Sequence, residues 1–160
     1  MHLEVTQYQE TNRQQIIARY DVMKNGKTWL TLIIARPGRL RDGLLALVTT
    51  IPQIKIVGLM DYETSVLWMV DRYQPALVVL DCSLFGDEVR SWVEHIKALQ
   101  PQTQCLVMAN SAHQQELAVA GGAGEVLLKG FPATELFSSV ERLLAENHRL
   151  NSADRAPCSQ

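Results

Sequence analysis

Residues 76–81, ALVVLD, form an unbroken apolar run that ends in a carboxylate. Four other segments have the same texture: TWLTLIIA (28–35), IKIVGL (54–59), TQCLVMA (103–109) and GEVLLK (124–129). Strands that are apolar at nearly every position, rather than at every second one, are typical of a parallel sheet covered by helices on both faces. We therefore predict five parallel β-strands.

Segments with helical periodicity separate and follow these strands. They are 39–50, 61–73, 86–100, 113–122 and 132–150. Pro52, Pro75 and Pro101 close the first three, and Pro132 lies in the first turn of the last, where proline is favoured. Alternating strands and helices predict an α/β domain with a doubly wound, flavodoxin-like (βα)5 fold and a five-stranded parallel sheet.

The two ends of the chain depart from this pattern. Residues 1–27 are polar, with a few apolar side chains at helix-like spacing, and we expect an N-terminal extension that is either a short helix or a loose arm. Residues 28–148 form the predicted domain. Residues 149–160 are expected to be a flexible tail or the start of a linker.

Composition limits the classes of function. A chain of 160 residues with 47% hydrophobic and 20% charged residues suits one soluble globular domain. The net charge of -2 argues against direct nucleic-acid binding, which usually requires a basic surface. We see neither a secretion signal nor a membrane span, and the three cysteines lack a CxxC spacing. We expect a cytoplasmic protein with reduced thiols.

Charged side chains stand where two of the strands end. The 76–81 strand ends in Asp81 and the last strand in Lys129, whereas the first ends in Ala35 and is followed by Arg36. Because the carboxyl ends of parallel strands meet at one edge of a sheet, these four residues are expected to share a site.

These strand ends and their surroundings resemble the receiver (CheY-like) domains of two-component response regulators, most closely those that precede helix-turn-helix output domains. The segments that carry the resemblance are RLRDGLLALV, IPQIKIVGL, QPALVVLDCSLFG and GGAGEVLLKGFPATELFSSVERLL. It extends from about Thr28 to Leu144. It implies the same flavodoxin-like fold and a role in signalling.

The resemblance also implies roles for particular residues. In receivers, two acids after the first strand and an Asp after the third bind Mg²⁺, the third-strand Asp is phosphorylated, and a Lys after the fifth strand pairs with the phosphoryl group. By this resemblance Asp81 holds the phosphoacceptor position and Lys129 the lysine position. The acid pair falls on Ala35 and Arg36.

Two further receiver positions are replaced. The Thr or Ser after the fourth strand, which senses the phosphoryl group, falls on Ala109, and the aromatic switch residue of the fifth strand falls on Val126. At the metal site, two cations (Arg36 and Lys129) face one acid (Asp81), whereas clustered acids would attract a hard divalent cation. We therefore predict a degenerate pseudo-receiver without a metal or other cofactor.

Several side chains allow two interpretations. Arg36 could point inward and pair with Asp81, or point to solvent. Asp81 could be a working phosphoacceptor, but a strand-end carboxylate bonded to Lys129 is the preferred interpretation. Asp87 and Glu88 could be substitute metal ligands, but first-turn acids that favour the helix dipole are the preferred interpretation. Cys82 could be a redox sensor, but a buried structural thiol is preferred because nothing beside it in the sequence lowers its pKa.

We expect a regulatory module that is not an enzyme and acts through protein–protein contacts, with a role in transcriptional regulation. A homodimer, a histidine kinase and a transcription regulator are the expected partners, and the face between the fourth and fifth helices is the expected contact surface. One alternative is an active receiver, phosphorylated on Asp81 by a histidine kinase with Mg²⁺. Another is a sensor of a small anion or nucleotide near Arg36, Arg39 and Arg41.

Overall fold

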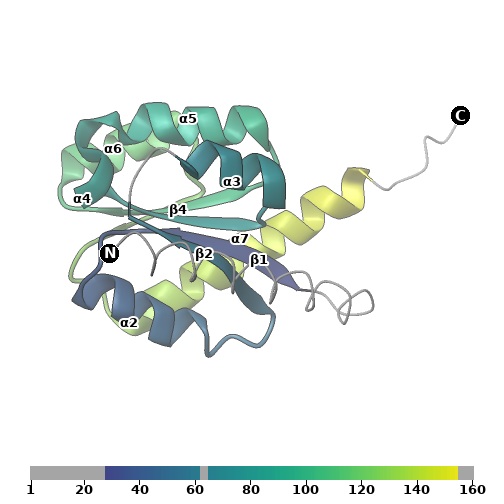
Figure 1. Ribbon diagram of the computed structural model, residues 1–160, viewed down its shortest axis with the longest axis horizontal. Helices are drawn as coiled ribbons and strands as arrows, with labels where there is room; N and C mark the ends of the chain where they lie inside the picture. Colours follow the sequence, from purple (N-terminus) through teal and green to yellow (C-terminus); the bar gives the residue numbers. More distant parts are fainter. Residues whose placement is uncertain (1–27, 62–64, 155–160) are drawn as a thin grey trace, which may run out of the picture.

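The structure, a computed structural model, describes residues 28–61 and 65–154, so the predicted extension over residues 1–27 lies outside it. The described residues form a five-stranded sheet in the order β2-β1-β3-β4-β5, in which all neighbouring strands are parallel (Figure 1). The strands are β1 (Trp29–Ile34), β2 (Ile54–Met60), β3 (Leu77–Asp81), β4 (Gln104–Ala109) and β5 (Glu125–Leu128). This order is the flavodoxin-like one, so the predicted fold class is confirmed.

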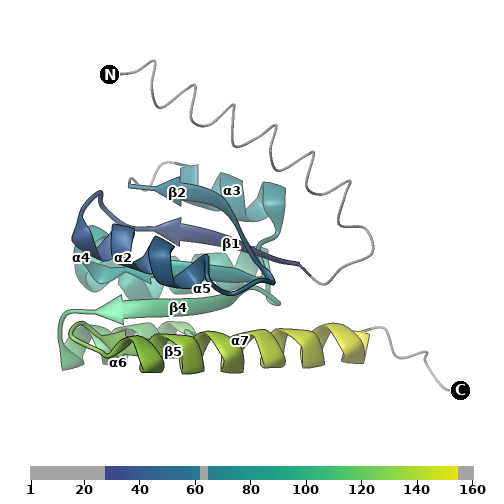
Figure 2. The same cartoon turned by 90° about the horizontal axis from the view of Figure 1, so that it is seen from below.

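Helices cover both faces of the sheet (Figures 1 and 2). One layer contains α2 (Arg39–Val48) and α7 (Ala133–Asp154). The other contains α3 (Val66–Tyr73), α5 (Val89–Leu99) and α6 (Ala112–Gly121). No helix among the described residues is both long and apolar enough to cross a membrane.

The sheet separates two apolar cores because alternate residues of each strand point to opposite faces. Leu32 and Leu80 belong to the core under α3, α5 and α6, whereas Ile33 and Val79 belong to the core under α2 and α7. All four side chains are fully buried. Each is worth about 1.5–3 kcal/mol relative to an exposed side chain, so burial on both faces accounts for the unbroken apolar runs.

The helix expected to begin at residue 86 is preceded by more helical structure. α4 (Cys82–Phe85) follows β3 directly, and a 3-10 turn (Gly86–Glu88) joins it to α5. The carboxylate of Asp81 is the reason, since it accepts a hydrogen bond from the Ser83 backbone N–H at 3.0 Å and so caps α4. The chain therefore turns into a helix at the candidate site itself.

The last helix is longer than predicted. We expected a flexible tail from residue 149, but α7 continues to Asp154, and its C-terminal part extends past the sheet (Figures 1 and 2). No glycine or proline occurs between Ala133 and Asp154, and the first helix breaker in the sequence is Pro157. The polar composition that indicated a tail is equally compatible with an exposed helical turn.

Candidate functional site

The carboxyl ends of the strands bring the residues singled out in the sequence to one edge of the sheet. Asp81 is the last residue of β3, the central strand, and Lys129 follows β5. Ala35 follows β1 on one side of β3, and Ala109 ends β4 on the other. The ends of β3 and β5 therefore bring an acid and a base to the same edge, while the neighbouring ends of β1 and β4 carry alanines.

Asp81 and Lys129 form an ion pair. The Lys129 Nζ lies 2.6 Å from the Asp81 Oδ1, and the two side chains are 26% and 6% exposed. The same Oδ1 accepts the backbone N–H of Ser83 that caps α4. The carboxylate is thus held by an ammonium and a backbone donor, and charge-assisted hydrogen bonds of this kind are stronger than neutral ones.

Ser83 and Asn110 extend this pair into a network that the sequence analysis missed. Lys129 Nζ also donates to the Ser83 hydroxyl, and the Asn110 side-chain amide donates to the same oxygen at 3.4 Å. The Asn110 backbone N–H donates in turn to Gln114 Oε1 at 2.9 Å. Polar residues directly after two apolar strands were the signal available in the sequence. The network links the ends of β3, β4 and β5.

The end of β1 contributes no acid. Ala35 is fully buried in the core under α2 and α7, and its backbone N–H donates to the Met60 carbonyl at 2.8 Å. Arg36 is exposed to solvent, and the ion pair of Asp81 is with Lys129. Of the two arrangements considered for Arg36, the structure therefore has the outward one.

The carboxyl edge of the sheet is where a receiver-like fold would bind Mg²⁺, so the residues there can be compared with the needs of this ion. Mg²⁺ takes six oxygen ligands in near-octahedral geometry. Here Asp81 is the carboxylate at the centre of the edge, and its Oδ1 already contacts an ammonium. Ala35 offers a methyl group and Arg36 a cation, and neither can act as a ligand of a metal ion. The residues present do not fit a magnesium ion.

Among the described residues, the other candidate acids are remote from Asp81 or exposed to solvent. Asp61 follows β2, which is two strands from β3, so it stands about 10 Å from Asp81 at the usual strand spacing. Asp87 and Glu88 are exposed residues of the 3-10 turn before α5. Over residues 28–61 and 65–154, no group of three or more His, Cys, Asp or Glu side chains could hold a metal ion.

The remaining predicted positions are apolar. Ala109 is fully buried, and Val126 is partly buried against the core under α3, α5 and α6. Cys82 is fully buried. Burial raises the pKa of its thiol to about 11, and the neighbouring Asp81 charge adds to this shift. The expected burial of Cys82 is confirmed, and the raised pKa agrees with the preferred interpretation of a structural thiol.

Comparison with known proteins gives matches at the level of structure. No family model and no curated protein sequence matches the chain. A LuxR-family two-component response regulator from Aurantimonas sp. SI85-9A1 superposes with a TM-score of 0.66 and 20% sequence identity, covering 74% of this chain and 86% of that chain. The chain has the fold of a receiver domain.

Two further receiver domains show the same fold. The receiver domain of the sensor histidine kinase PA1611 from Pseudomonas aeruginosa PAO1 has a TM-score of 0.64 and 16% identity, over 74% of this chain and 98% of that chain. The receiver domain of the response regulator NarL from Mycobacterium tuberculosis has a TM-score of 0.64 and 18% identity, over 77% and 98%. The receiver fold of this chain thus recurs at low sequence identity.

Proposed function

We propose that the chain is a regulatory module of two-component signalling that acts through protein–protein contacts, without Mg²⁺-dependent phosphorylation and without catalysis of its own. The observation that carries this proposal is the ion pair of Asp81 with Lys129, beside a buried Ala35 and an exposed Arg36. In this proposal the chain keeps the phosphoacceptor Asp and the Lys of a receiver site, but it lacks the acids that hold the metal ion in receivers.

The chemistry of phosphoryl transfer explains why these replacements matter. A carboxylate that attacks a phosphoryl group meets negative oxygens, and a divalent cation normally neutralises the charge that develops between them. At this edge the donors around Asp81 are an ammonium and a backbone N–H. They stabilise the carboxylate in its resting state and lower its reactivity as a nucleophile.

The residues at the two receiver switch positions, Ala109 and Val126, support a module that keeps one conformation. Ala109 has no hydroxyl group to follow a phosphoryl group, and Val126 has no aromatic ring whose rotamer could report on one. Ser83 and Asn110 instead connect the strand ends through hydrogen bonds that need no phosphoryl group. The conformation of this edge is therefore built into the sequence.

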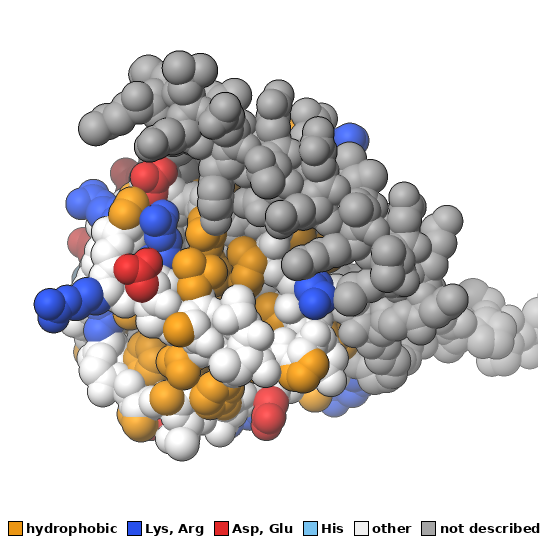
Figure 3. All heavy atoms as spheres, turned by 60° about the horizontal axis from the view of Figure 1, so that its bottom comes forward, with side chains coloured by type: hydrophobic (Ala, Val, Ile, Leu, Met, Phe, Trp, Pro, Cys, Tyr) orange, Lys and Arg blue, Asp and Glu red, His pale blue; other side chains and the backbone are white. Residues whose placement is uncertain are grey.

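We place the partner contact on the face formed by α6, β5 and α7. Val119 of α6 and Leu128 of β5 are 59% and 44% exposed, although both are apolar. Arg142 of α7 forms an ion pair with Glu125 of β5 at 2.6 Å on the same face. Apolar side chains also lie among charged ones on the side of the molecule toward α2 and α7 (Figure 3). A second copy of the chain or a transcription regulator is the proposed partner.

The test is the intact mass of the protein after incubation with acetyl phosphate and Mg²⁺. The proposal expects no added phosphoryl mass, under conditions in which a reactive receiver used as positive control gains it. A Mg²⁺-dependent gain that disappears in the Asp81→Asn variant would overturn the proposal. It would establish the second candidate, an active receiver phosphorylated on Asp81, which the presence of an Asp and a Lys at positions 81 and 129 favours.

A further inference from the structure

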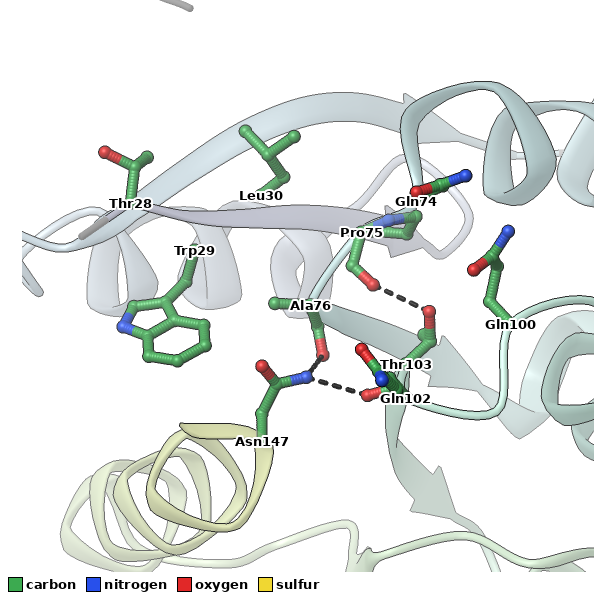
Figure 4. Close-up of a pocket in the computed structure, with 10 residues that line it drawn as sticks. All are labelled: Thr28, Trp29, Leu30, Gln74, Pro75, Ala76, Gln100, Gln102, Thr103 and Asn147. Carbon is green, nitrogen blue, oxygen red and sulfur yellow. Dashed lines mark hydrogen bonds between the residues drawn. The ribbon is translucent and has the colours of Figure 1, made fainter. Parts of the chain in front are cut away.

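The edge of the sheet opposite Asp81 contains a pocket of about 240 Å³ (Figure 4). Its walls come from the start of β1, the turns that precede β3 and β4, and α7. Pockets for small-molecule ligands usually measure about 300–1,000 Å³. This pocket is smaller, and its volume suits one or two amino-acid side chains.

The walls of the pocket are held by hydrogen bonds between segments that are distant in sequence. The Asn147 side-chain amide donates to the carbonyls of Gln102 at 2.7 Å and Ala76 at 3.5 Å, which fixes α7 to both turns. The Thr103 hydroxyl donates to the Pro75 carbonyl at 2.7 Å (Figure 4). The pocket is therefore preformed, and an occupant does not need to order it.

The chemistry of the walls selects a neutral occupant. The lining residues that the structure describes carry no charged side chain. Trp29, Leu30 and Pro75 supply apolar surface, and Gln74 and Gln100 supply side-chain amides. Of the described lining residues, six are polar and four are apolar. A peptide segment matches this mixed surface, since burial of its apolar side chains is favourable and the polar side chains can bond to its peptide groups.

A peptide with these properties is joined to the rim of the pocket. Residues 1–27 lead directly into Thr28, which lines the pocket itself. Asn25-Gly26, a strong turn signal, would reverse the chain and direct the preceding residues back over this edge. At full extension the five residue-to-residue steps from Met23 to Thr28 span about 17 Å, so side chains before the turn can reach the pocket.

The N-terminal segment also has a stripe of suitable side chains. Ile16, Ile17, Tyr20 and Met23 recur at helical spacing among polar residues. We propose that the pocket is the docking site of the chain's own N-terminal segment, residues 1–27, which inserts side chains of this stripe. Because the tether is short, the segment is present at an effective concentration of the order of millimolar, well above that of a competing peptide.

Docking at this edge leaves the opposite edge, with Asp81 and Lys129, open. The inference is therefore independent of the proposed function, and either can fail without the other. The N-terminal segment would cover the edge of the sheet at which the strands begin (the amino edge) and leave exposed the edge at which they end (the carboxyl edge).

The experiment uses the full chain and the fluorescence of Trp29, which lines the pocket. Trp68→Phe and Trp92→Phe remove the other two of the chain's three tryptophans. In this background, Ile17→Asp with Tyr20→Asp introduces charge into the apolar stripe, and quenching by acrylamide measures access to the indole. Docking predicts that the quenching constant rises about twofold in this variant, because the intramolecular contact is lost.

The matched control is Thr11→Asp with Ala18→Asp, which adds the same charge on the opposite side of a helix over these residues. It is expected to leave quenching unchanged. Equal quenching in the stripe variant and the parent would overturn the proposal. Protection of Trp29 that appears only at high protein concentration would also overturn it, because the occupant would then be a second copy of the chain.

Discussion

Replacing Lys129 with Met tests the ion pair on which the proposed function rests. The substitution keeps most of the side-chain stem and removes the ammonium from Asp81 Oδ1 and from the Ser83 hydroxyl. Asp81 is almost fully buried, so its charge would lose its partner in a poorly solvated place. We expect the free energy of unfolding to fall at neutral pH.

The magnitude follows from the geometry. At the 2.6 Å separation of Nζ and Oδ1 and an effective dielectric constant of about 20, the attraction is about 6 kcal/mol before desolvation. Breaking a fully buried pair costs about 3–5 kcal/mol, but the Lys129 side chain is 26% exposed, and water partly screens it. We expect Lys129→Met to cost about 2 kcal/mol.

Urea unfolding of a double-mutant cycle is the assay. Asp81→Asn keeps an acceptor that can cap α4, so by itself it should cost about 1 kcal/mol or less. The coupling energy between Lys129→Met and Asp81→Asn should be about 1.5 kcal/mol. The control is Arg90→Met, because the Arg90–Glu94 pair has side chains that are 56% and 50% exposed, and its loss should cost about 0.5 kcal/mol or less. Zero coupling, or equal effects of Lys129→Met and Arg90→Met, would refute the reasoning.

Four further predictions concern packing, hydrogen bonding and thiol chemistry. A Cβ on Gly121 would lie 2.6 Å from a backbone carbonyl oxygen of α5, so Gly121→Ala should lower the free energy of unfolding in urea by about 1–3 kcal/mol. A Cβ on Gly43 would meet no atom within 4 Å, so Gly43→Ala should raise the same free energy by about 0.5–1 kcal/mol. Asn147→Ala should cost about 1–3 kcal/mol, because it leaves two carbonyls without this donor, and an unchanged unfolding midpoint would contradict the bonds described. Burial raises the pKa of Cys82 to about 11 and of Cys105 to about 12, so neither should react with iodoacetamide at pH 8, as mass spectrometry would show. Since both thiols ionise more readily when unfolded, with a reference pKa of 9.0, stability should decline as pH rises above 9.

Local pattern was enough to predict the fold and the location of the candidate site. Apolar runs mark strands buried on both faces, and prolines mark the ends of helices, because both signals depend on a few adjacent residues. Once the sheet is parallel, Asp81 and Lys129 must lie at the same edge, since every strand ends there. The absence of an acidic side chain at Ala35 and Arg36 is equally a property of the sequence.

The lengths of two helical segments could not be inferred in this way. α4 forms directly after β3 because the side chain of Asp81 caps it. An Asp at a strand end can act either as a chemical group or as a helix cap, and the sequence indicated only the first role. The last residues of α7, up to Asp154, contain no helix breaker and can therefore stay helical, although their polar composition indicated a tail. In both cases one local property supported two conformations.

By itself, the sequence determined which strands form, which residues stand at their ends, and that Ala35 and Arg36, neither of them an acid, follow the first strand. The tertiary structure decided that Asp81 pairs with Lys129 while Arg36 turns to solvent, and that Ser83 and Asn110 complete the network. The pocket lined by Trp29, Pro75 and Asn147 also exists only in the tertiary structure, because its walls come from separate parts of the chain. The physical reason is that long polar side chains choose among partners by distance and burial, and these depend on how segments distant in sequence pack together.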